Sequence, residues 1–257
     1  MGEYDFILDT MRWSFSSANS FENCHGGFKL TYIDAEERIG NAFSDYGSFV
    51  HLILEKYFKD ELKLNELADF YQNNYNNYMF NNFPTYPEGM GANYFTSGKN
   101  FFEKFNFDKS LYDIIFIEDY INAKFNNILL TVKPDLILKE KSTGKYILID
   151  YKTAKLKTGK AYKEQISEYK RQFLLYSYFL WTEKNIEIKQ LKIWFIRDNK
   201  EITIDVDVAE TMETMDWFET TIRHIKNEKE WKFNNSKENS YFCNNLCGVR
   251  NSCPMKN

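Results

Sequence analysis

The sequence predicts an α/β fold, in which the helices and strands of one large domain pack around a hydrophobic core. Segments whose apolar residues recur at helical spacing alternate with short runs rich in β-branched and aromatic residues. Only 4 prolines and 11 glycines interrupt the 257 residues, of which 43% are hydrophobic and 18% aromatic. A chain of this length and composition can bury a substantial core, which excludes a largely disordered protein.

The N-terminal part is predicted to be helical. Residues 13–33 are expected to form a helix that begins at Ser16 or Ser17, because a serine side chain can accept a hydrogen bond from the free N–H groups of a first turn. The adjacent glycines Gly26 and Gly27 are expected to break this helix.

A second helix is predicted over 40–59, where apolar residues again recur at helical spacing. This helix carries His51 and Glu55 one turn apart, so the two polar side chains can share a face. Residues 62–110 are rich in Asn and Tyr and only weakly periodic, and they are expected to form a helical insertion with a long loop.

The rest of the chain is predicted to alternate between strands and helices. Three β-rich runs follow one another with short connections, which predicts a meander, and residues 139–144 resemble the turn of a hairpin. The predicted strands are 114–125, 128–138, 145–151, 186–196 and 201–208, the predicted helices are 161–182 and 209–229, and residues 231–257 form an Asn- and Cys-rich tail.

Charged residues beside two of these strands form the most informative pattern. In a hairpin, Asp135 lies near one strand and Asp150 near its partner, while the period of two directs Asp150 and Lys152 to the same side. Two carboxylates about 4 Å apart repel each other by roughly 4 kcal/mol at an effective dielectric constant near 20, so a divalent cation is expected between them. Oxygen ligands of this kind suit Mg²⁺ or Mn²⁺, and a neighbouring lysine can orient water and stabilise charge on a phosphate. The alternative is that Asp150 and Lys152 are a chance solvated pair in a lysine-rich chain.

Pro134-Asp135 followed by Asp150-Tyr151-Lys152 resembles the signature of the PD-(D/E)xK nuclease superfamily. Other residues, in matching order along the chain, resemble the RecB-like branch of that superfamily. They are a G-x-x-x-H-x-x-x-E pattern at Gly47, His51 and Glu55, a glutamate before the meander at Glu118, and a Q-x-x-x-Y pattern at Gln172 and Tyr176. One departure is that Val132 and Lys133 stand where the family often has a glycine.

The resemblance implies a restriction-endonuclease-like core, with a central mixed sheet flanked by helices. It implies that Asp135, Asp150 and Lys152 are catalytic and that a metal is held by His51, Asp135, Asp150 and Glu118. For Gln172 and Tyr176 it implies nucleic-acid positioning beside the metal. Taken singly, each residue has a plainer interpretation: a core histidine, a strand-edge carboxylate, or a stacked pair on a helix.

Four cysteines are the second notable pattern. Cys243, Cys247 and Cys253 lie close together near the end of the sequence, and Cys24 can supply a fourth thiolate if the ends of the chain meet. Thiolates at such spacings favour zinc or an iron-sulfur cluster. The arrangement resembles the iron-sulfur clasp of AddB-type and CRISPR-associated RecB-like nucleases, which implies a 4Fe-4S cluster. The first C-terminal pair is separated by three residues where that clasp usually has two, so zinc stays an alternative.

The net charge of −4 does not by itself indicate a nucleic-acid-binding protein. Basic charge is nevertheless concentrated between Lys139 and Lys163, a segment with eight lysines and two acidic residues. This segment can attract phosphates, and Lys155, Lys157 and Lys160 are the candidate nucleic-acid-binding residues within it. The alternative is a solvated lysine loop.

These features lead to the expectation of a divalent-metal-dependent DNA nuclease, in particular an exonuclease that acts on DNA ends or single strands in recombination, repair or phage replication. A helicase or recombination protein is a candidate partner. The alternatives are a non-catalytic DNA-binding or assembly subunit of a helicase-nuclease complex and a CRISPR-adaptation nuclease. The expected organisation is a nuclease core over 1–230, with its insertion at about 62–110, and a tail over 231–257 that closes a metal cluster with Cys24. The chain contains neither a membrane-spanning segment nor a basic secretory signal, so a cytoplasmic location is expected.

Overall fold

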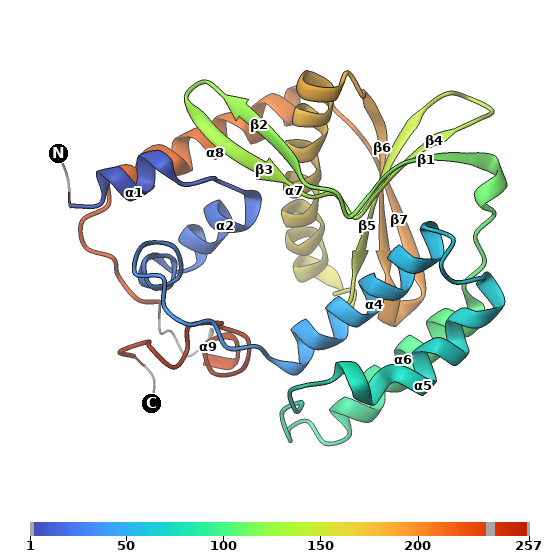
Figure 1. Ribbon diagram of the computed structural model, residues 1–257. Coiled ribbons are helices and arrows are strands. Elements are labelled where there is room, and N and C mark those ends of the chain that lie inside the picture. The colour runs from blue at the N-terminus through green and yellow to red at the C-terminus, as the bar shows by residue number, and fades with distance from the viewer. Residues whose placement is uncertain (1–2, 235–239, 256–257) are drawn as a thin grey trace. The chain divides into compact units, whose positions relative to one another are not determined.

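The computed structural model describes residues 3–234 and 240–255 (Figure 1), which divide into two compact units. The larger unit consists of Asn41–Tyr120 and Lys133–Thr211. The smaller unit consists of Met1–Gly40, Ile121–Val132 and Met212–Asn257. Within the described ranges, none of the helices combines the length and the apolar character that crossing a membrane requires.

The larger unit is built on a mixed five-stranded sheet with strand order β1-β4-β5-β6-β7 (Figure 1). Neighbouring strands are antiparallel except for β5 and β6, which are parallel. This is the central mixed sheet that the sequence predicts. The strands are β1 (Tyr112–Ile117), β4 (Leu136–Glu140), β5 (Tyr146–Lys152), β6 (Ile188–Phe195) and β7 (Lys200–Asp205).

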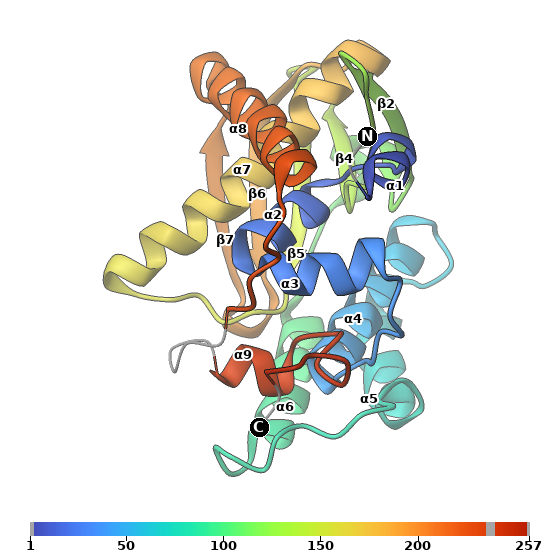
Figure 2. The ribbon, with the colours of Figure 1, turned by 90° about the vertical axis from the view of Figure 1, so that its left-hand side faces the viewer.

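Helices cover both faces of this sheet. Residues of α4, α5 and α6 share a core cluster with one set of alternating strand residues, including Leu136, Ile149 and Tyr151. Helix α7 packs on the opposite face, where Tyr169 lies against Phe195, and Figure 2 shows it crossing in front of β6 and β7. The helices of this unit are α4 (Ala42–Phe58), α5 (Leu67–Tyr78), α6 (Met90–Lys104) and α7 (Gly159–Lys184), with short 3₁₀ turns at Leu64–Glu66, Lys109–Leu111 and Ile196–Asp198.

The β4–β5 hairpin fixes the relative positions of the residues beside its two strands. Leu136 pairs with Ile149 and Leu138 with Ile147, so Asp135 and Asp150 lie at the same end of the hairpin. The turn at the other end contains Gly144, whose φ of 70° is one that glycine adopts readily. The sequence predicts this hairpin and the placement of the two aspartates correctly.

The strands of the predicted meander pair antiparallel in the expected order, but two of them are each divided in two. The run 114–125 becomes β1 and β2 (Ile121–Phe125), and the run 128–138 becomes β3 (Ile128–Val132) and β4. Strands β2 and β3 form a separate two-stranded sheet in the smaller unit, and β1 pairs with β4. The breaks have local causes: Glu118 has a left-handed backbone with φ of 52°, and Pro134 has no N–H to donate to a ladder.

The smaller unit combines the β2–β3 hairpin with several short helices and most of the long helix α8. The helix predicted within 13–33 begins after Ser14 rather than at Ser16 or Ser17, because Ser14 and Ser17 form a reciprocal capping box. This helix ends at Cys24, and Gly26 and Gly27 lie inside the next helical turn instead of breaking the first. The elements are α1 (Asp5–Thr10), α2 (Phe15–Asn23), α3 (His25–Phe28), a π-helical turn (Lys29–Ile33), α8 (Val208–Asn227, whose first turn belongs to the larger unit) and α9 (Ser240–Asn245).

Candidate metal centre

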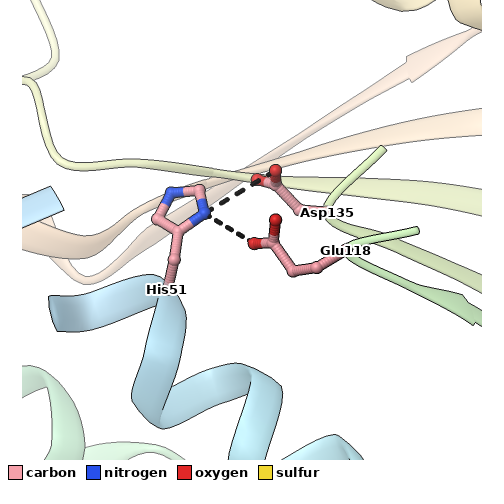
Figure 3. Close-up of side chains that lie close together, drawn as sticks. All are labelled: His51, Glu118 and Asp135. Atoms are coloured by element: carbon pink, nitrogen blue, oxygen red, sulfur yellow. Dashed lines mark hydrogen bonds and ion pairs between the residues drawn. The ribbon is translucent and has the colours of Figure 1, made fainter. Parts of the chain in front are cut away.

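Three candidate ligands meet in the larger unit at the end of β1 and the start of β4. His51 comes from the middle of α4, Glu118 directly follows β1, and Asp135 directly precedes β4. One side-chain ligand atom from each residue lies within 4.8 Å of those of the other two (Figure 3). The structure therefore brings together three of the four residues for which the sequence predicts a metal-binding role.

Helix α4 presents His51 at the edge of its buried face. The helix begins at a capping box formed by Asn41 and Ser44, and its apolar residues join the core cluster against the sheet. The His51 ring is partly exposed, and its Nδ1 lies 2.9 Å from Glu118 Oε1 and 3.6 Å from Asp135 Oδ1 (Figure 3). Its Nε2 lies 3.1 Å from the backbone oxygen of Tyr151. The imidazole thus spans the acidic residues and the strand that carries Asp150 and Lys152.

The two carboxylates are fixed by the backbone around them. The Glu118 N–H donates to the Asp135 carbonyl oxygen at 3.0 Å, which joins the two segments at the base of a long excursion of the chain. Asp135 Oδ2 accepts a hydrogen bond from the Tyr151 N–H at 2.8 Å, and Glu118 Oε2 forms a 2.6 Å ion pair with Lys133. Both side chains are almost fully buried. Their positions are therefore set by the strands and not by flexible loops.

Asp150 and Lys152 lie next to this group, on the face of β5 that is directed toward α7. Lys152 Nζ lies 2.8 Å from Asp150 Oδ2 and donates to Gln172 Oε1 at 3.1 Å. The ammonium also lies 4.6 Å from the centre of the Tyr169 ring and 5.4 Å from that of Phe173, distances typical of cation–π contacts. Asp150 is outside the group of three mutually close ligand atoms in the described part of the chain.

The charges of the site are strongly coupled. Burial by itself lowers the pKa of His51, but Asp135, Glu118 and Asp150 outweigh burial and raise that pKa to about 9. Burial and the nearby Asp150 carboxylate raise the pKa of Asp135 above its usual range. Burial also opposes the charged form of Lys152, yet Asp150 and Asp135 hold its pKa above the ordinary value. The three carboxylates therefore favour the charged forms of the neighbouring His51 and Lys152.

The donor set fits a divalent metal ion. It offers an imidazole nitrogen and carboxylate oxygens, which suit Mg²⁺ or Mn²⁺. Asp150 Oδ2 is buried and, among the described residues, has the Lys152 ion pair but no hydrogen bond of ordinary geometry. A buried carboxylate oxygen in this state has unused capacity to bind a cation. His51, Glu118 and Asp135 are the residues that would hold the ion, and the neighbouring Asp150 is a candidate fourth ligand.

Gln172 and Tyr176 lie one turn apart on α7 and connect to Lys152, not to open solvent. Gln172 uses its oxygen to accept from Lys152 and its Nε2 to donate to the Tyr176 hydroxyl at 3.0 Å. Tyr176 is only 7% exposed, and burial raises the pKa of its hydroxyl to about 12. A neutral tyrosine in this position supports the glutamine that contacts the lysine, and its buried ring has little surface on which a base could stack.

The lysines that the sequence groups together are divided by the hairpin. Lys139 and Lys145 lie near its turn, about 17 Å from the metal centre if each of the roughly five intervening residues contributes about 3.3 Å. Lys155 and Lys157 lie on the metal-centre side, in the exposed segment between β5 and α7, and the exposed Lys160 lies in the first turn of α7. This segment is anchored because Gln165 accepts from the Lys157 N–H and donates to the Lys155 carbonyl oxygen.

Several contributors are not evident from the sequence pattern. Lys133, which binds Glu118, is distinguished only by its place beside Pro134-Asp135. Tyr169 and Phe173, which surround the Lys152 ammonium, precede Tyr176 by seven and three residues, a spacing that places them near one face of α7. Glu55 completes the sequence pattern on α4 but forms an ion pair with Lys59 at 2.6 Å, outside the group of three ligands.

The four cysteines all belong to the smaller unit. Cys24 Sγ accepts hydrogen bonds from the N–H groups of Gly27 and Asn234, each at 3.3 Å, and Cys243 Sγ lies 3.5 Å from the Asn234 carbonyl oxygen. Burial, followed by the other three thiols, raises the pKa of Cys243. The cysteine sulfurs do not form a group of mutually close ligand atoms among the described residues, so the predicted 4Fe-4S cluster is not shown.

Comparison with known proteins agrees with this geometry. The model of the PD-(D/E)XK nuclease superfamily matches residues 12–254, which is nearly the whole chain. A comparison with curated proteins found no match. The mixed sheet, the helices on both faces and the acidic site beside Lys152 are consistent with the restriction-endonuclease-like fold of that family. The chain therefore belongs to the PD-(D/E)XK superfamily of metal-dependent nucleases.

Proposed function

We propose that this protein is a divalent-metal-dependent deoxyribonuclease whose active site is the centre formed by His51, Glu118, Asp135, Asp150 and Lys152. The observation that carries the proposal is the juxtaposition of a three-residue ligand group with a buried, charged lysine in one compact unit. Family membership supports a nuclease, and DNA is the substrate that it suggests.

The residues of the site have separable roles in this proposal. His51, Glu118, Asp135 and Asp150 hold Mg²⁺ or Mn²⁺. The ion supplies Lewis-acid stabilisation of the phosphate and acidifies a bound water molecule. Lys152 remains protonated because its pKa is raised, so it is a poor general base and instead orients water and stabilises negative charge on the phosphate. Gln172 and Tyr176 keep the lysine in place.

Exonuclease activity of the RecB-like kind is the finer proposal. The pattern of Gly47, His51 and Glu55 on α4, together with Gln172 and Tyr176 on α7, supports this branch. The proposal places the enzyme at DNA ends or single strands in recombination, repair or phage replication, with a helicase or recombination protein as its partner. The exposed lysines Lys155, Lys157 and Lys160 are the proposed phosphate contacts.

Cleavage of end-labelled single- and double-stranded DNA in Mg²⁺ or Mn²⁺ tests the activity and its polarity. Asp150→Asn and Lys152→Met are each expected to reduce the rate by about 10²- to 10³-fold, as expected when a group that stabilises transition-state charge is lost. The matched controls are Asp113→Asn on the exposed part of β1 and Lys145→Met at the hairpin turn, which should cleave like the unaltered protein. Full metal-dependent cleavage by the Lys152 variant would refute the assignment.

The cysteines carry a second, structural proposal within the same protein. Cys24, Cys243, Cys247 and Cys253 hold a 4Fe-4S cluster that joins the two ends of the chain. The bridging position of Asn234 between Cys24 and Cys243 supports it, as do the interactions among the thiols that raise the pKa of Cys243. Protein purified without oxygen should be brown with absorption near about 400 nm. Stoichiometric zinc in a colourless protein would replace the iron-sulfur proposal with a zinc site.

A further inference from the structure

A cavity of about 580 Å³ opens beside the metal centre, within the larger unit. One wall is the exposed side of α4, from Ser44 through Gly47 to His51, and Glu118 and Lys133 close the end at the metal centre. Tyr78, the last residue of α5, and Phe80, two residues later, also line the cavity. The volume falls in the range of about 300–1,000 Å³ that is typical of small-ligand sites and is large enough for a nucleotide.

Phe80 is unusual because its ring is 79% exposed although its backbone is firmly held. Asp45 Oδ2 accepts three hydrogen bonds from this segment, from the Phe80 N–H at 2.9 Å and from the backbone and side-chain nitrogens of Asn81 at 2.7 and 3.0 Å. Tyr78, by contrast, is stacked on Phe49 at 4.6 Å. No ring contact involves Phe80 within the described ranges, so the anchored segment presents an uncovered aromatic face at the cavity.

The charges of the cavity wall are already matched by neighbouring donors. Asp45 is engaged by the Phe80 segment, Glu55 by Lys59, and Glu118 by both His51 and Lys133. Because Lys133 is itself committed to Glu118, the wall offers no uncommitted lysine or arginine for a phosphate. It offers serine hydroxyls and an exposed aromatic ring, and the ring can stack on a base.

We infer that Phe80 is a stacking platform for one unpaired base of the nucleic acid strand whose phosphate lies at the metal centre. The inference rests on the proposed nuclease function and specifies its substrate class. A base can cover the Phe80 ring only when it is unstacked from its neighbour on that side, so the preferred substrate is a single strand or an end with unpaired nucleotides.

The test compares Phe80→Ala and Phe80→Trp with Tyr86→Ala in steady-state cleavage of a single-stranded oligonucleotide with Mn²⁺. Tyr86 is the matched control because it is 83% exposed on the same insertion but is not part of the cavity wall. Stacking of one base predicts that Phe80→Ala raises KM by about tenfold or more with a nearly unchanged kcat, and that Phe80→Trp restores KM. Tyr86→Ala should leave both constants unchanged.

An abasic substitution moved along the oligonucleotide identifies the stacked base. At one position, the abasic substitution should raise the KM of the unaltered protein as much as Phe80→Ala does. At that position it should raise the KM of the Phe80→Ala variant no further. Equal KM values for Phe80→Ala and the unaltered protein, or additive losses at every position, would overturn the inference.

Binding of an oligonucleotide that contains 2-aminopurine, measured with Ca²⁺, separates this inference from the proposed function. If the unaltered protein binds but does not cleave in Mn²⁺, the catalytic proposal fails, while a change in fluorescence that disappears in Phe80→Ala still supports stacking. If the unaltered protein cleaves and Phe80→Ala neither weakens binding nor alters the fluorescence change, only the stacking inference fails.

Discussion

Replacing Gln172 by methionine tests whether this residue positions Lys152 or contacts the substrate. Methionine keeps the length and burial of the side chain but removes the oxygen that accepts from the Lys152 ammonium at 3.1 Å. A hydrogen bond to a charged group contributes about 1.5–3 kcal/mol, which corresponds to about 10- to 150-fold in rate if the entire contribution is needed in the transition state. The ion pair with Asp150 and the rings of Tyr169 and Phe173 remain, so the lower end of this range is expected.

The assay is single-turnover and steady-state cleavage of labelled DNA, with kcat and KM determined separately. A positioning role predicts a lower kcat with little change in KM, because the substrate does not touch the altered residue. Gln172→Glu, which keeps an acceptor at the same distance, should recover most of kcat. The control is Glu183→Met at the exposed end of the same helix, which should match the unaltered protein. A higher KM with unchanged kcat in Gln172→Met would show that Gln172 binds nucleic acid and would refute the reasoning.

Three further predictions concern the metal, a helix cap and a helix contact. Because the pKa of His51 is raised to about 9 and a metal binds neutral imidazole, Mn²⁺ affinity measured by calorimetry should rise about tenfold per pH unit from pH 7 toward 9. His51→Gln should flatten this dependence, and a flat profile for the unaltered protein would contradict the assignment. In the metal-free protein, the raised pKa of His51 means that this residue contributes to the free energy of unfolding. Its contribution is fully present below about pH 6.5 and is lost as the pH rises through 9, which thermal melts across this range can check. Asn41→Ala removes the side chain that caps α4 through the Ser44 N–H, and urea unfolding should show a loss of about 0.5–2 kcal/mol. Gly98→Ala would place a Cβ 2.4 Å from the Tyr71 hydroxyl between α5 and α6, and the resulting overpacking should cost about 1–3 kcal/mol, so an unchanged melting temperature would argue against this contact.

The local part of the site could be predicted from the sequence because strand geometry determines it. A hairpin brings Asp135 and Asp150 to the same end, and a period of two directs Asp150 and Lys152 to one face of β5. His51 and Glu118 come from segments far away in the sequence, so only the resemblance to a family indicated them, and the structure was needed to show that they meet Asp135.

Other features depend on contacts that no local pattern encodes. The division of the β-rich runs follows from the left-handed backbone of Glu118 and the missing donor of Pro134, both of which occur inside sequences of high strand propensity. The partner of Gln172 could not be predicted, because helical spacing shows which residues share a face but not what that face touches. Similarly, Ser14 is preferred over Ser16 as a cap because Ser17 reciprocates its hydrogen bond.

The hydrogen bond between Glu118 and Asp135 has a practical consequence for altering the chain. It closes the base of the excursion that contains the β2–β3 hairpin, and the pairing of Ile117 with Leu136 supports it from the adjacent sheet. The strand pairing therefore offsets the entropic cost of bringing these two metal-binding segments together. This cost rises only slowly with the length of the excursion. Since doubling the length of a flexible loop costs only about 0.6 kcal/mol, the tip at Asn126 and Asn127 is a suitable place to insert a fluorescent label or an affinity tag. Such an insertion would lie several residues along the chain from both Glu118 and Asp135. The β1–β4 ladder would still set the separation of these two carboxylates.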